Sequence, residues 1–397
     1  MKRITMNAPL VEMPGDEMTR VLWTEIRQRL IEPFVELKTE VYDLSLHHRD
    51  ETDDAVTHQA AEAIRRWKVG VKCATITPTA EQARQYGLKR LWKSPNGTIR
   101  AALGGTVFRA PILTAAAKPY LPRWTKPITI ARHGFGDLYQ AAEYRTKEPG
   151  KAELIYTEEG GREIRKTVAE LPEGGVLLAQ YNTAESVRNF AEACFQYALS
   201  VKQDLWFSAK DTVSAQYDGL FREIFERTAE KYEDDFLRAG IRYRYRLIDS
   251  AAAAAIRSEG GFVWACKNYD GDVLSDLLAA AYGSIAMMSS VLVSPDGCFE
   301  FEAAHGTVPD QFLLYRQGKR TSVNPVATLW AWSGALRKRG EYDALPALCE
   351  YAQALEDAVK RTVAEGIMTD DLAELSGVPG TETVQFLDAV ADRMMLT

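Results

Sequence analysis

Short apolar runs alternate with amphipathic stretches along most of this chain. A polar stretch with helical spacing, Asp53–Lys68, precedes an apolar run, Val69–Ile76, that predicts a buried strand. Further buried strands are expected at Pro127–Ala131 and Val291–Ser294, and the apolar residues of Ala184–Gln203 recur at helical spacing. Strands that alternate with helices in this way predict an α/β protein.

A β-rich segment interrupts this pattern between about residues 137 and 182. The runs Glu153–Thr157 and Glu163–Val168 flank a turn at Gly160-Gly161 and predict a β-hairpin, and Val176–Tyr181 predicts a third strand. So small a β unit buries little apolar surface by itself. We therefore expect it to pair with another element, and the same segment in a second copy of the chain is one candidate.

The start of the helix at Ala184–Gln203 has a sequence signal of its own. Asn182, with Glu185 three residues later, predicts a capping box before the helix at Ala184–Gln203.

The stretch Leu277–Pro295 carries no charge and is long enough to cross a membrane. Because it contains several serines and is flanked by aspartates, we expect a buried helix that runs into a buried strand, and no membrane partner.

Composition narrows the class of protein. The 397 residues, 46% of them hydrophobic, are enough for two or three domains. The formal net charge is −7 and no basic stripe is present, so nucleic acid is not an expected partner. The five cysteines are scattered without a CxxC pair, which argues against a disulfide framework or a zinc site. With no signal peptide at the N-terminus, a cytoplasmic location is expected.

The common nucleotide-binding motifs are missing from the sequence. The nearest approach to a dinucleotide fingerprint is Gly134–Tyr139, but its sixth position is tyrosine and a β-rich segment follows it instead of a helix. No glycine stands five residues before Gly318-Lys319, so this pair is not a phosphate-binding P-loop. Any nucleotide is therefore expected to bind outside a Rossmann fold.

The stretch Ser94–Arg100 predicts an anion site. It opens with residues typical of a helix N-cap and first turn, and Gly104-Gly105 would end that helix. Free N–H groups at a helix N-terminus attract anions. Arg109 and Arg132 add guanidinium groups of the kind that bind carboxylates. The alternative is an ordinary capped helix with solvated arginines.

Acidic residues near position 270 predict a metal site. Asp272 and Asp276 are four residues apart, so a helix that starts here places both carboxylates on one face. Asp249 is a candidate third ligand, and such hard oxygen ligands suit Mg²⁺ or Mn²⁺. The alternative is an acidic helix start that the helix dipole favours.

These residues, in this order, resemble the β-decarboxylating dehydrogenases, and most strongly the eukaryotic-type homodimeric isocitrate dehydrogenases. The resemblance runs over nearly the whole chain to about residue 335 and weakens afterwards. The blocks that carry it are Gly15–Arg20, Ala74–Pro78, Trp92–Arg100, Gly104–Arg109, Gly260–Asp272, Glu302–Val308 and Thr321–Pro325.

The resemblance implies a fold and a reaction. The fold is the isocitrate/isopropylmalate dehydrogenase-like α/β fold, which is distinct from the Rossmann fold and has a large α/β domain, a small α/β domain and a β-rich clasp. The reaction is oxidation of isocitrate by hydride transfer to a nicotinamide, followed by loss of CO₂ to give 2-oxoglutarate. The implied domains are residues 1–103 with 283–397 (large), 104–136 with 183–282 (small) and 137–182 (clasp).

The resemblance also implies roles for individual residues. The residues implied for the tricarboxylate are Thr77, Ser94, Asn96, Arg100, Arg109 and Arg132. Those implied for Mg²⁺ or Mn²⁺ are Asp249, Asp272 and Asp276, and those for proton transfer are Tyr139 and Lys210. In this family Lys210 and Asp249 come from the opposite subunit, so a homodimer with shared active sites is implied. The implied coenzyme residues are Thr75, Thr77, Arg257, His305, Gly306, Thr307, Val308, Asp310, Gln311 and Asn324.

One departure from the family pattern bears on the coenzyme. NADP-specific members carry basic and imidazole side chains shortly after the His-Gly-Thr turn, where this chain has Asp310 and Gln311. Asp310 suits a free ribose 2′-hydroxyl and repels a 2′-phosphate, so we expect an NAD-dependent enzyme. Ala254 replaces a phosphate-contacting amide and agrees. Arg257 keeps a positive charge, and NADP is therefore the alternative coenzyme.

Two further alternatives concern the substrate and the activity. Isopropylmalate or homoisocitrate fits less well as substrate, because Ser94 and Asn96 suit the extra carboxylate of isocitrate. An inactive regulatory subunit would lack a proton donor or a metal carboxylate, and this sequence retains both kinds of residue.

Overall fold

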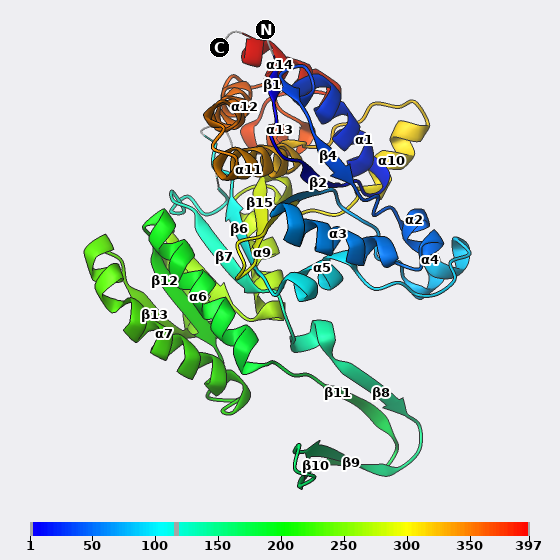
Figure 1. Ribbon diagram of the computed structural model, residues 1–397, viewed down its shortest axis with the longest axis vertical. Coiled ribbons are helices and arrows are strands. Elements are labelled where there is room, and N and C mark those ends of the chain that lie inside the picture. Colours follow the sequence, from blue (N-terminus) through cyan, green and yellow to red (C-terminus); the bar gives the residue numbers. More distant parts are fainter. Residues whose placement is uncertain (1–2, 115–118, 396–397) are drawn as a thin grey trace.

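A ten-stranded sheet runs through the centre of the protein (Figure 1). The structure, a computed structural model, describes residues 3–114 and 119–395. The strand order is β13-β12-β14-β7-β6-β15-β16-β5-β2-β4. In that order the strands are Tyr243–Leu247, Asp204–Ala209, Phe262–Cys266, Ile128–His133, Thr106–Pro111, Met288–Val293, Phe299–Ala303, Val69–Lys72, Leu10–Met13 and Thr39–Val41. A separate parallel pair joins β1 (Ile4–Thr5) to β3 (Val35–Glu36).

The central sheet consists of two parallel blocks that run in opposite directions. Strands β13, β12, β14 and β7 are parallel to one another, and so are β16, β5, β2 and β4. Between the blocks, β6 and β15 pair antiparallel with each other and with the neighbouring strand on either side. The predicted α/β class is confirmed, and the predicted buried strands at residues 69, 127 and 291 all belong to this sheet.

Helices cover both faces of the sheet. Helices α6, α7, α11 and α12 pack their apolar side chains on one face, and α3, α5, α8 and α9 pack on the other. The α-helices α1 to α14 are Glu17–Ile26, Leu46–Glu51, Ala55–Trp67, Ala80–Gln85, Pro95–Leu103, Ala184–Val201, Tyr217–Ala239, Ile248–Arg257, Asn268–Ala281, Pro309–Arg316, Val326–Tyr342, Pro346–Ala364, Asp370–Ser376 and Thr383–Met395. A π-helix, η1 (Arg27–Ile31), extends α1, and η2 (Asp137–Gln140) and η3 (Ile285–Met287) are short 3₁₀ helices.

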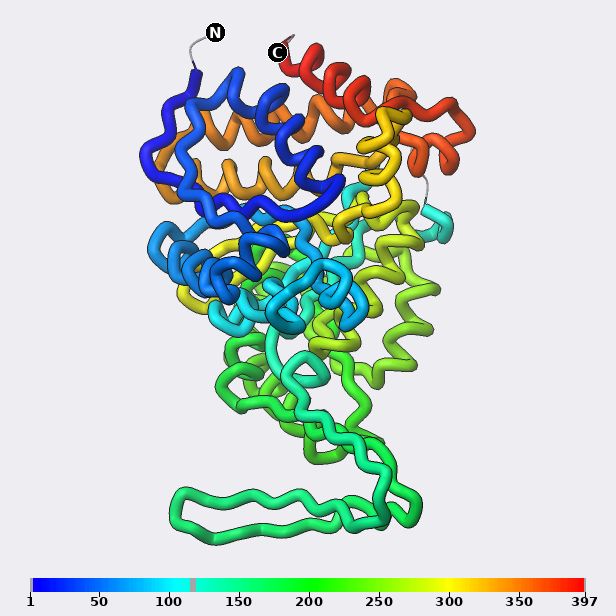
Figure 2. Tube along the Cα trace, turned by 90° about the vertical axis from the view of Figure 1, so that its right-hand side faces the viewer, coloured from blue at the N-terminus to red at the C-terminus, as the bar shows by residue number. Residues whose placement is uncertain are grey.

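The β-rich segment forms two ribbons that project from the body of the molecule (Figures 1 and 2). β9 (Gly150–Thr157) pairs antiparallel with β10 (Glu163–Leu171), which confirms the predicted hairpin. The predicted third strand is β11 (Gly175–Ala179), and it pairs with β8 (Ala142–Thr146), a strand that the pattern did not reveal. The ribbons expose many large apolar side chains to solvent: Tyr144, Leu154, Ile155, Tyr156, Ile164, Val168, Val176 and Leu178.

One predicted helix cap is wrong by one residue. Thr183, and not Asn182, is the N-cap of α6, and its hydroxyl accepts a hydrogen bond from Ser186 N at 3.2 Å. The Asn182 amide instead donates to Asp137 Oδ1 at 2.8 Å and to Tyr217 Oη at 2.7 Å. These long-range contacts occupy the side chain that a local capping rule assigned to the helix.

The uncharged stretch 277–295 is the end of α9 followed by η3 and β15, as expected. No helix within residues 3–114 and 119–395 has the length and apolar character needed to cross a membrane. The predicted division into large domain, small domain and clasp stays a prediction.

Candidate active site

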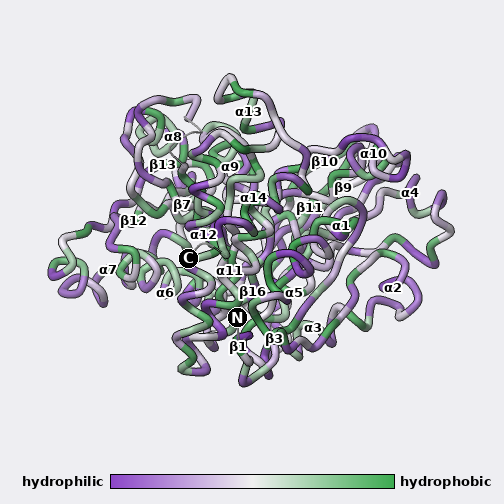
Figure 3. Tube along the Cα trace, turned by 90° about the horizontal axis from the view of Figure 1, so that it is seen from above, coloured by the Kyte–Doolittle hydropathy of each residue, from purple (hydrophilic) through white to green (hydrophobic). Residues whose placement is uncertain are grey.

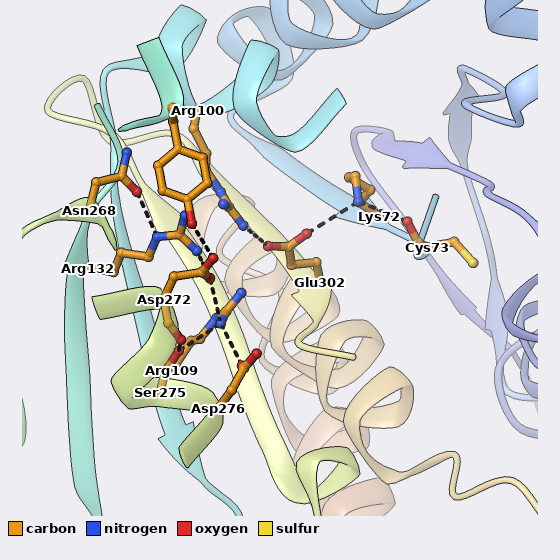
Figure 4. Close-up of polar contacts among 11 residues, drawn as sticks. Lys72, Cys73, Arg100, Arg109, Arg132, Asn268, Asp272, Ser275, Asp276 and Glu302 are labelled. Carbon is orange, nitrogen blue, oxygen red and sulfur yellow. Dashed lines mark hydrogen bonds and ion pairs between the residues drawn. The ribbon is translucent and has the colours of Figure 1, made fainter. Parts of the chain in front are cut away.

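Strand register gathers charged side chains on one face of the central sheet. Arg109 of β6 lies opposite Ser290 of β15, which lies opposite Glu302 of β16. Side chains alternate between the two faces of a strand, so residues that pair directly share a face. Helix α5 brings Arg100 to this face and β7 brings Arg132, and the guanidinium groups converge there (Figure 4).

Arg109 is held by side chains from the middle of α9. Its Nη1 atom donates to Ser275 Oγ at 2.8 Å, to Asp276 Oδ1 at 3.1 Å and to Asp272 Oδ1 at 3.4 Å. Asp272 and Asp276 therefore share one helix face, as their spacing predicted. The Nε atom of Arg109 is buried and has no hydrogen-bond partner among the described residues.

Arg132 also binds α9. It donates from Nε to Asn268 Oδ1 at 2.8 Å and pairs through Nη1 with Asp272 (Figure 4). Gly271 makes this approach possible, because a β-carbon there would lie only 2.8 Å from Cβ of Arg132. The glycine that precedes Asp272 thus has a packing role.

Tyr139 lies on η2 beside the same groups. Its hydroxyl donates to Asp272 Oδ2, and the Arg132 guanidinium lies over its ring at 4.7 Å from the ring centre. Burial, and after it the Asp272 carboxylate, raises the pKa of Tyr139 to about 12. The phenol is therefore protonated near neutral pH and can donate a proton.

The three arginines form a buried, crowded set of positive charges. Burial, followed by repulsion from Arg100 and Arg109, lowers the pKa of Arg132. Arg100 and Arg132 line a small cavity together with Tyr139 and Asn268. Crowded guanidinium groups, one with a spare N–H donor, form a receptor for a multiply charged anion.

Two buried side chains, Asp16 and Arg49, hold the loop that carries Thr75 and Thr77. Ile76 N donates to Asp16 Oδ2 at 2.9 Å, and Ile76 O accepts from Arg49 Nη1 at 3.0 Å. Both threonines are at least partly open to solvent. Sequence reasoning missed Asp16 and Arg49 as site residues, because their partners are main-chain atoms far away along the chain.

Ser94 lies at the N-terminus of α5, as predicted. It is the N-cap residue, but its side chain makes no capping hydrogen bond, so the hydroxyl is available to a ligand. Arg49 reaches this loop as well, donating from Nη2 to Lys93 O at 3.0 Å. Asn96 lies in the first turn of α5, and its buried Oδ1 atom has no partner in the described part of the chain.

The three predicted metal ligands are not brought together within one chain. Asp249, in the first turn of α8, pairs with Lys210 Nζ at 2.6 Å, and Asp272 and Asp276 pair with arginines. Among residues 3–114 and 119–395, no three His, Cys, Asp or Glu side chains cluster as a metal-binding group. The donor chemistry of Asp272 and Asp276 fits a hard divalent cation, and a third ligand has to come from elsewhere.

The predicted coenzyme turn lies between β16 and α10. His305 donates from Nδ1 to Gly306 O at 2.9 Å, while its buried Nε2 atom has no partner among the described residues. Thr307 donates through its hydroxyl to Glu17, and Val308 adopts a left-handed conformation at φ 57°. This turn fits a nucleotide, since it holds a spare ring nitrogen and small residues.

The remaining coenzyme candidates differ in availability. Gln311 Oε1 accepts from Ser322 N at 3.2 Å, and Asn324 is buried and bonded to Asp371 Oδ2 at 2.9 Å. Both side chains therefore support the loop structure. Asp310 is exposed in the first turn of α10.

Arg257 is not near this turn within one chain. It is exposed at the C-terminal end of α8, which packs on β12 and β13, whereas α10 packs on α1. The two helices lie on opposite sides of the molecule (Figure 3). Lys210, Asp249 and Arg257 thus form one group on and beside α8, and the other predicted residues lie elsewhere.

The fold and the site define a mixed α/β protein in which three buried arginines are paired with carboxylates of α9 and β16. A family model described as isocitrate/isopropylmalate dehydrogenase matches residues 5–390. The chain therefore belongs to the isocitrate/isopropylmalate dehydrogenase family.

Relatives that match almost the whole chain are isocitrate dehydrogenases. A Mycobacterium tuberculosis protein named isocitrate dehydrogenase (NADP) 1 is 47% identical over 398 residues, which cover 99% of this chain and 97% of the relative. A Homo sapiens protein named isocitrate dehydrogenase (NADP), mitochondrial, is 46% identical over 404 residues, covering 99% and 89%. A Sphingobium yanoikuyae protein named isocitrate dehydrogenase (NADP) is 45% identical over 394 residues, covering 98% and 97%. Because one relative is mitochondrial, the cytoplasmic location stays a prediction.

The expectation of an NAD-dependent enzyme is wrong, because these relatives are all named NADP enzymes. The expectation rested on the charge of Asp310 without its surroundings. Asp310 is solvent-exposed, where screening reduces like-charge repulsion far below its value at a buried position. Its place in the first turn of α10 is also where a carboxylate is favoured by the helix dipole alone.

Proposed function

We propose that this protein oxidises isocitrate with NADP as coenzyme and releases CO₂ to form 2-oxoglutarate. The observation that carries the proposal is the buried set of three guanidinium groups, Arg100, Arg109 and Arg132, beside two carboxylates of α9. Isocitrate carries three carboxylates, and arginine forks match carboxylate geometry. The names of the mycobacterial and human relatives support both the reaction and the coenzyme.

The substrate carboxylates have unused protein groups to bind. Arg109 Nε is a buried donor without a partner in the described residues, and the Ser94 hydroxyl makes no capping bond. Isocitrate bound here would satisfy Arg109 and face the free N–H groups of the first turn of α5.

Tyr139 is the proton donor in this proposal. Removal of the proton from the hydroxyl oxygen and of a hydride from the carbon that bears it leaves a ketone, and loss of CO₂ then leaves an enol. The enol carbon must take up a proton, and the phenol of Tyr139 holds one because its pKa is raised to about 12. Lys210 is the candidate base for the hydroxyl proton.

Two bound groups are required beside these residues. A divalent cation held by Asp272 and Asp276, with Asp249 from a second subunit, would act as a Lewis acid on the substrate oxygens. NADP would accept the hydride from the oxidised carbon.

The turn at His305–Val308 is the proposed coenzyme site. Its support is the buried His305 Nε2 atom without a partner in the described chain, together with the small residues around it. Arg257 of a second subunit is the proposed cation for the 2′-phosphate, since in one chain it lies away from this turn.

A homodimer with shared sites is part of the proposal. Lys210, Asp249 and Arg257 lie on one surface around α8, and none of them contacts Tyr139 or Asp272 in the interactions of the single chain. The projecting ribbons expose apolar side chains that a second copy would cover.

The test is an initial-rate assay with isocitrate and Mn²⁺, run in parallel with NADP and NAD. We expect NADP reduction that depends on isocitrate, and a kcat/KM at least about tenfold lower with isopropylmalate or homoisocitrate. Excess EDTA should abolish turnover. Absence of NADP reduction would overturn the proposed function, and full activity in EDTA would overturn the metal assignment alone.

A further inference from the structure

A buried carboxylate lies directly behind the proposed substrate arginine Arg100. Glu302, on β16, accepts from Arg100 Nη2 at 2.8 Å through Oε1 and pairs with Lys72 Nζ at 3.3 Å through Oε2 (Figure 4). Only 4% of its surface is exposed. One carboxylate therefore bridges two cations from different elements.

The bridge is anchored in the sheet. Glu302 and Lys72 are direct partners in the parallel pairing of β16 and β5, so their backbones are fixed relative to each other. Lys72 Nζ also donates to Cys73 O at 3.0 Å. The carboxylate oxygen that faces Arg100 is thus held by two strands, whereas Arg100 itself comes from a helix.

The electrostatics match this geometry. Burial opposes ionisation, yet Lys72, Arg100 and Arg109 together hold the pKa of the Glu302 carboxyl below its ordinary range. The charge of Glu302 in turn raises the pKa of Arg100 against the effect of burial. Each group stabilises the charged form of the other.

A second carboxyl on the same strand provides a natural contrast. Glu300 lies two residues before Glu302 on the same face of β16, and its Oε1 atom is buried without a partner in the described residues. Burial, and after it the charge of Glu302, raises the pKa of Glu300. Glu300 bridges nothing, although it has the same chemistry and the same burial.

We propose that Glu302 is a positioning residue that fixes the Arg100 guanidinium in the orientation that binds a substrate carboxylate, with Lys72 as its second anchor. The inference rests on the proposed function, because it deepens the role of Arg100 in the same site. An arginine held at one nitrogen by a fixed carboxylate presents its remaining N–H donors in one direction, which lowers the entropic cost of binding.

The first test is Glu302→Gln. The amide offers one acceptor and one donor, so either Arg100 or Lys72 then meets an N–H donor in place of an oxygen. We expect KM for isocitrate to rise about tenfold or more with kcat changed less than about threefold, and KM for the coenzyme unchanged. Glu302→Asp keeps the charge but is too short to bridge both cations, and it should raise KM for isocitrate in the same way.

Glu300→Gln is the matched control. It replaces a carboxyl by an amide on the same strand face, where the carboxyl oxygen Oε1 has no partner in the described residues, and its KM for isocitrate should stay within about twofold of the wild-type value. If Glu302→Gln and Glu300→Gln raised KM for isocitrate equally, and raised KM for the coenzyme equally, this strand face would have a merely structural role. That result would overturn the proposal.

A double-mutant cycle tests whether Glu302 acts through Arg100. In an Arg100→Lys background, Glu302→Gln should change KM for isocitrate less than about twofold, because the group that it positions has gone. Multiplicative effects of the two substitutions would contradict positioning.

Crystal structures of these three variants separate this inference from the proposed function. The Arg100 guanidinium should be displaced in Glu302→Gln or Glu302→Asp and unmoved in Glu300→Gln, whether or not isocitrate is turned over. An Arg100 side chain that keeps its place without the Glu302 carboxylate would refute the positioning role even in an active enzyme. A failed isocitrate assay with a displaced Arg100 would refute only the proposed function.

Discussion

Arg109 uses one nitrogen atom for three acceptors and leaves another without any. Its Nη1 atom contacts Ser275, Asp276 and Asp272, while the buried Nε atom has no partner in the described chain. A buried donor without a partner costs about 1–3 kcal/mol. Under the proposed function, a substrate carboxylate that binds Arg109 Nε would recover this cost.

His133 follows Arg132 and is buried among aromatic side chains, and its Nδ1 atom also lacks a partner in the described chain. Its Nε2 atom contacts Ser186 Oγ at 2.8 Å, and its ring stacks on Phe190 and meets Phe221 edge-on. Burial lowers the pKa of His133 to about 3. The ring is therefore neutral in the folded protein at every pH where the enzyme would operate.

This lowered pKa predicts a pH dependence of stability. Below the unfolded-state pKa of about 6.5, the unfolded chain binds a proton that the native chain refuses, so the His133 contribution to stability is lost as the pH falls toward 3. Between pH 7 and pH 5 the loss is about 2 kcal/mol per protomer. Urea unfolding of the wild type and of His133→Gln, at equal protein concentration, measures it.

The variant retains a hydrogen-bonding group toward Ser186 but cannot titrate. We expect it to be less stable at pH 7, because ring stacking is lost, and to have a shallower fall in stability between pH 7 and pH 5. Parallel pH profiles for the two proteins would show that His133 does not titrate in this way.

At the scale of single elements, α5 shows what the sequence can predict. The pattern predicted a helix that starts after Ser94 and ends at Gly104-Gly105, and α5 is Pro95–Leu103 with Gly104 at φ 61°. Every signal for this helix lies within about a dozen residues, and a helix N-terminus is an anion site by its own chemistry. The arginines of the site could likewise be named from their sequence context.

The supports of α5 and its neighbouring loop could not be predicted. Asp16 binds Ile76 from 60 residues away, and Arg49 binds Lys93 from 44 residues away. Main-chain carbonyls leave no mark in the sequence, so a buried arginine that binds them looks like any surface arginine. The error over Asp310 has a related cause, since exposure decides how strongly its charge acts and exposure is a property of the fold.

Arg49 supplies a prediction at this scale. It is fully buried and donates to Ile76 O at 3.0 Å, to Lys93 O at 3.0 Å and to Asp54 Oδ1 at 3.1 Å. Lysine has one nitrogen and cannot span these acceptors, so Arg49→Lys should leave at least one buried carbonyl unpaired. We expect a loss of about 3 kcal/mol in the free energy of unfolding.

The same substitution should raise KM for isocitrate about threefold or more, because both the Thr75–Thr77 loop and the Ser94 loop lose a tether. Arg20→Lys is the matched control, since Arg20 pairs with Asp43 at the surface. Urea unfolding and initial rates measure the two effects. If Arg49→Lys lowered the free energy of unfolding but left KM for isocitrate unchanged, the hydrogen bonds of Arg49 would stabilise the fold without contributing to substrate binding.

At the scale of the whole molecule, the residues proposed for catalysis form two separate clusters within one chain. Tyr139, Asp272 and the arginines form one cluster, while Lys210 and Asp249 pair with each other around α8. The ribbons project from the body of the molecule (Figure 2). They expose apolar side chains to solvent. Both features have one explanation if two copies interlock through the ribbons and exchange the α8 residues.

Complementation between inactive variants tests this arrangement. If each site combines Tyr139 of one protomer with Lys210 of the other, a heterodimer of Lys210→Met and Tyr139→Phe protomers has one intact site and one doubly altered site. Random pairing of equal amounts makes half of the dimers mixed, so activity should recover to about a quarter of the wild-type value. Each variant treated alone is the control and should stay inactive.

Co-expression with two different affinity tags isolates the mixed dimer, in which activity should approach half of the wild-type value per dimer. A purified mixed dimer without activity would show that Tyr139 and Lys210 serve the same chain's site, and that the separation of the two clusters in one chain has another cause.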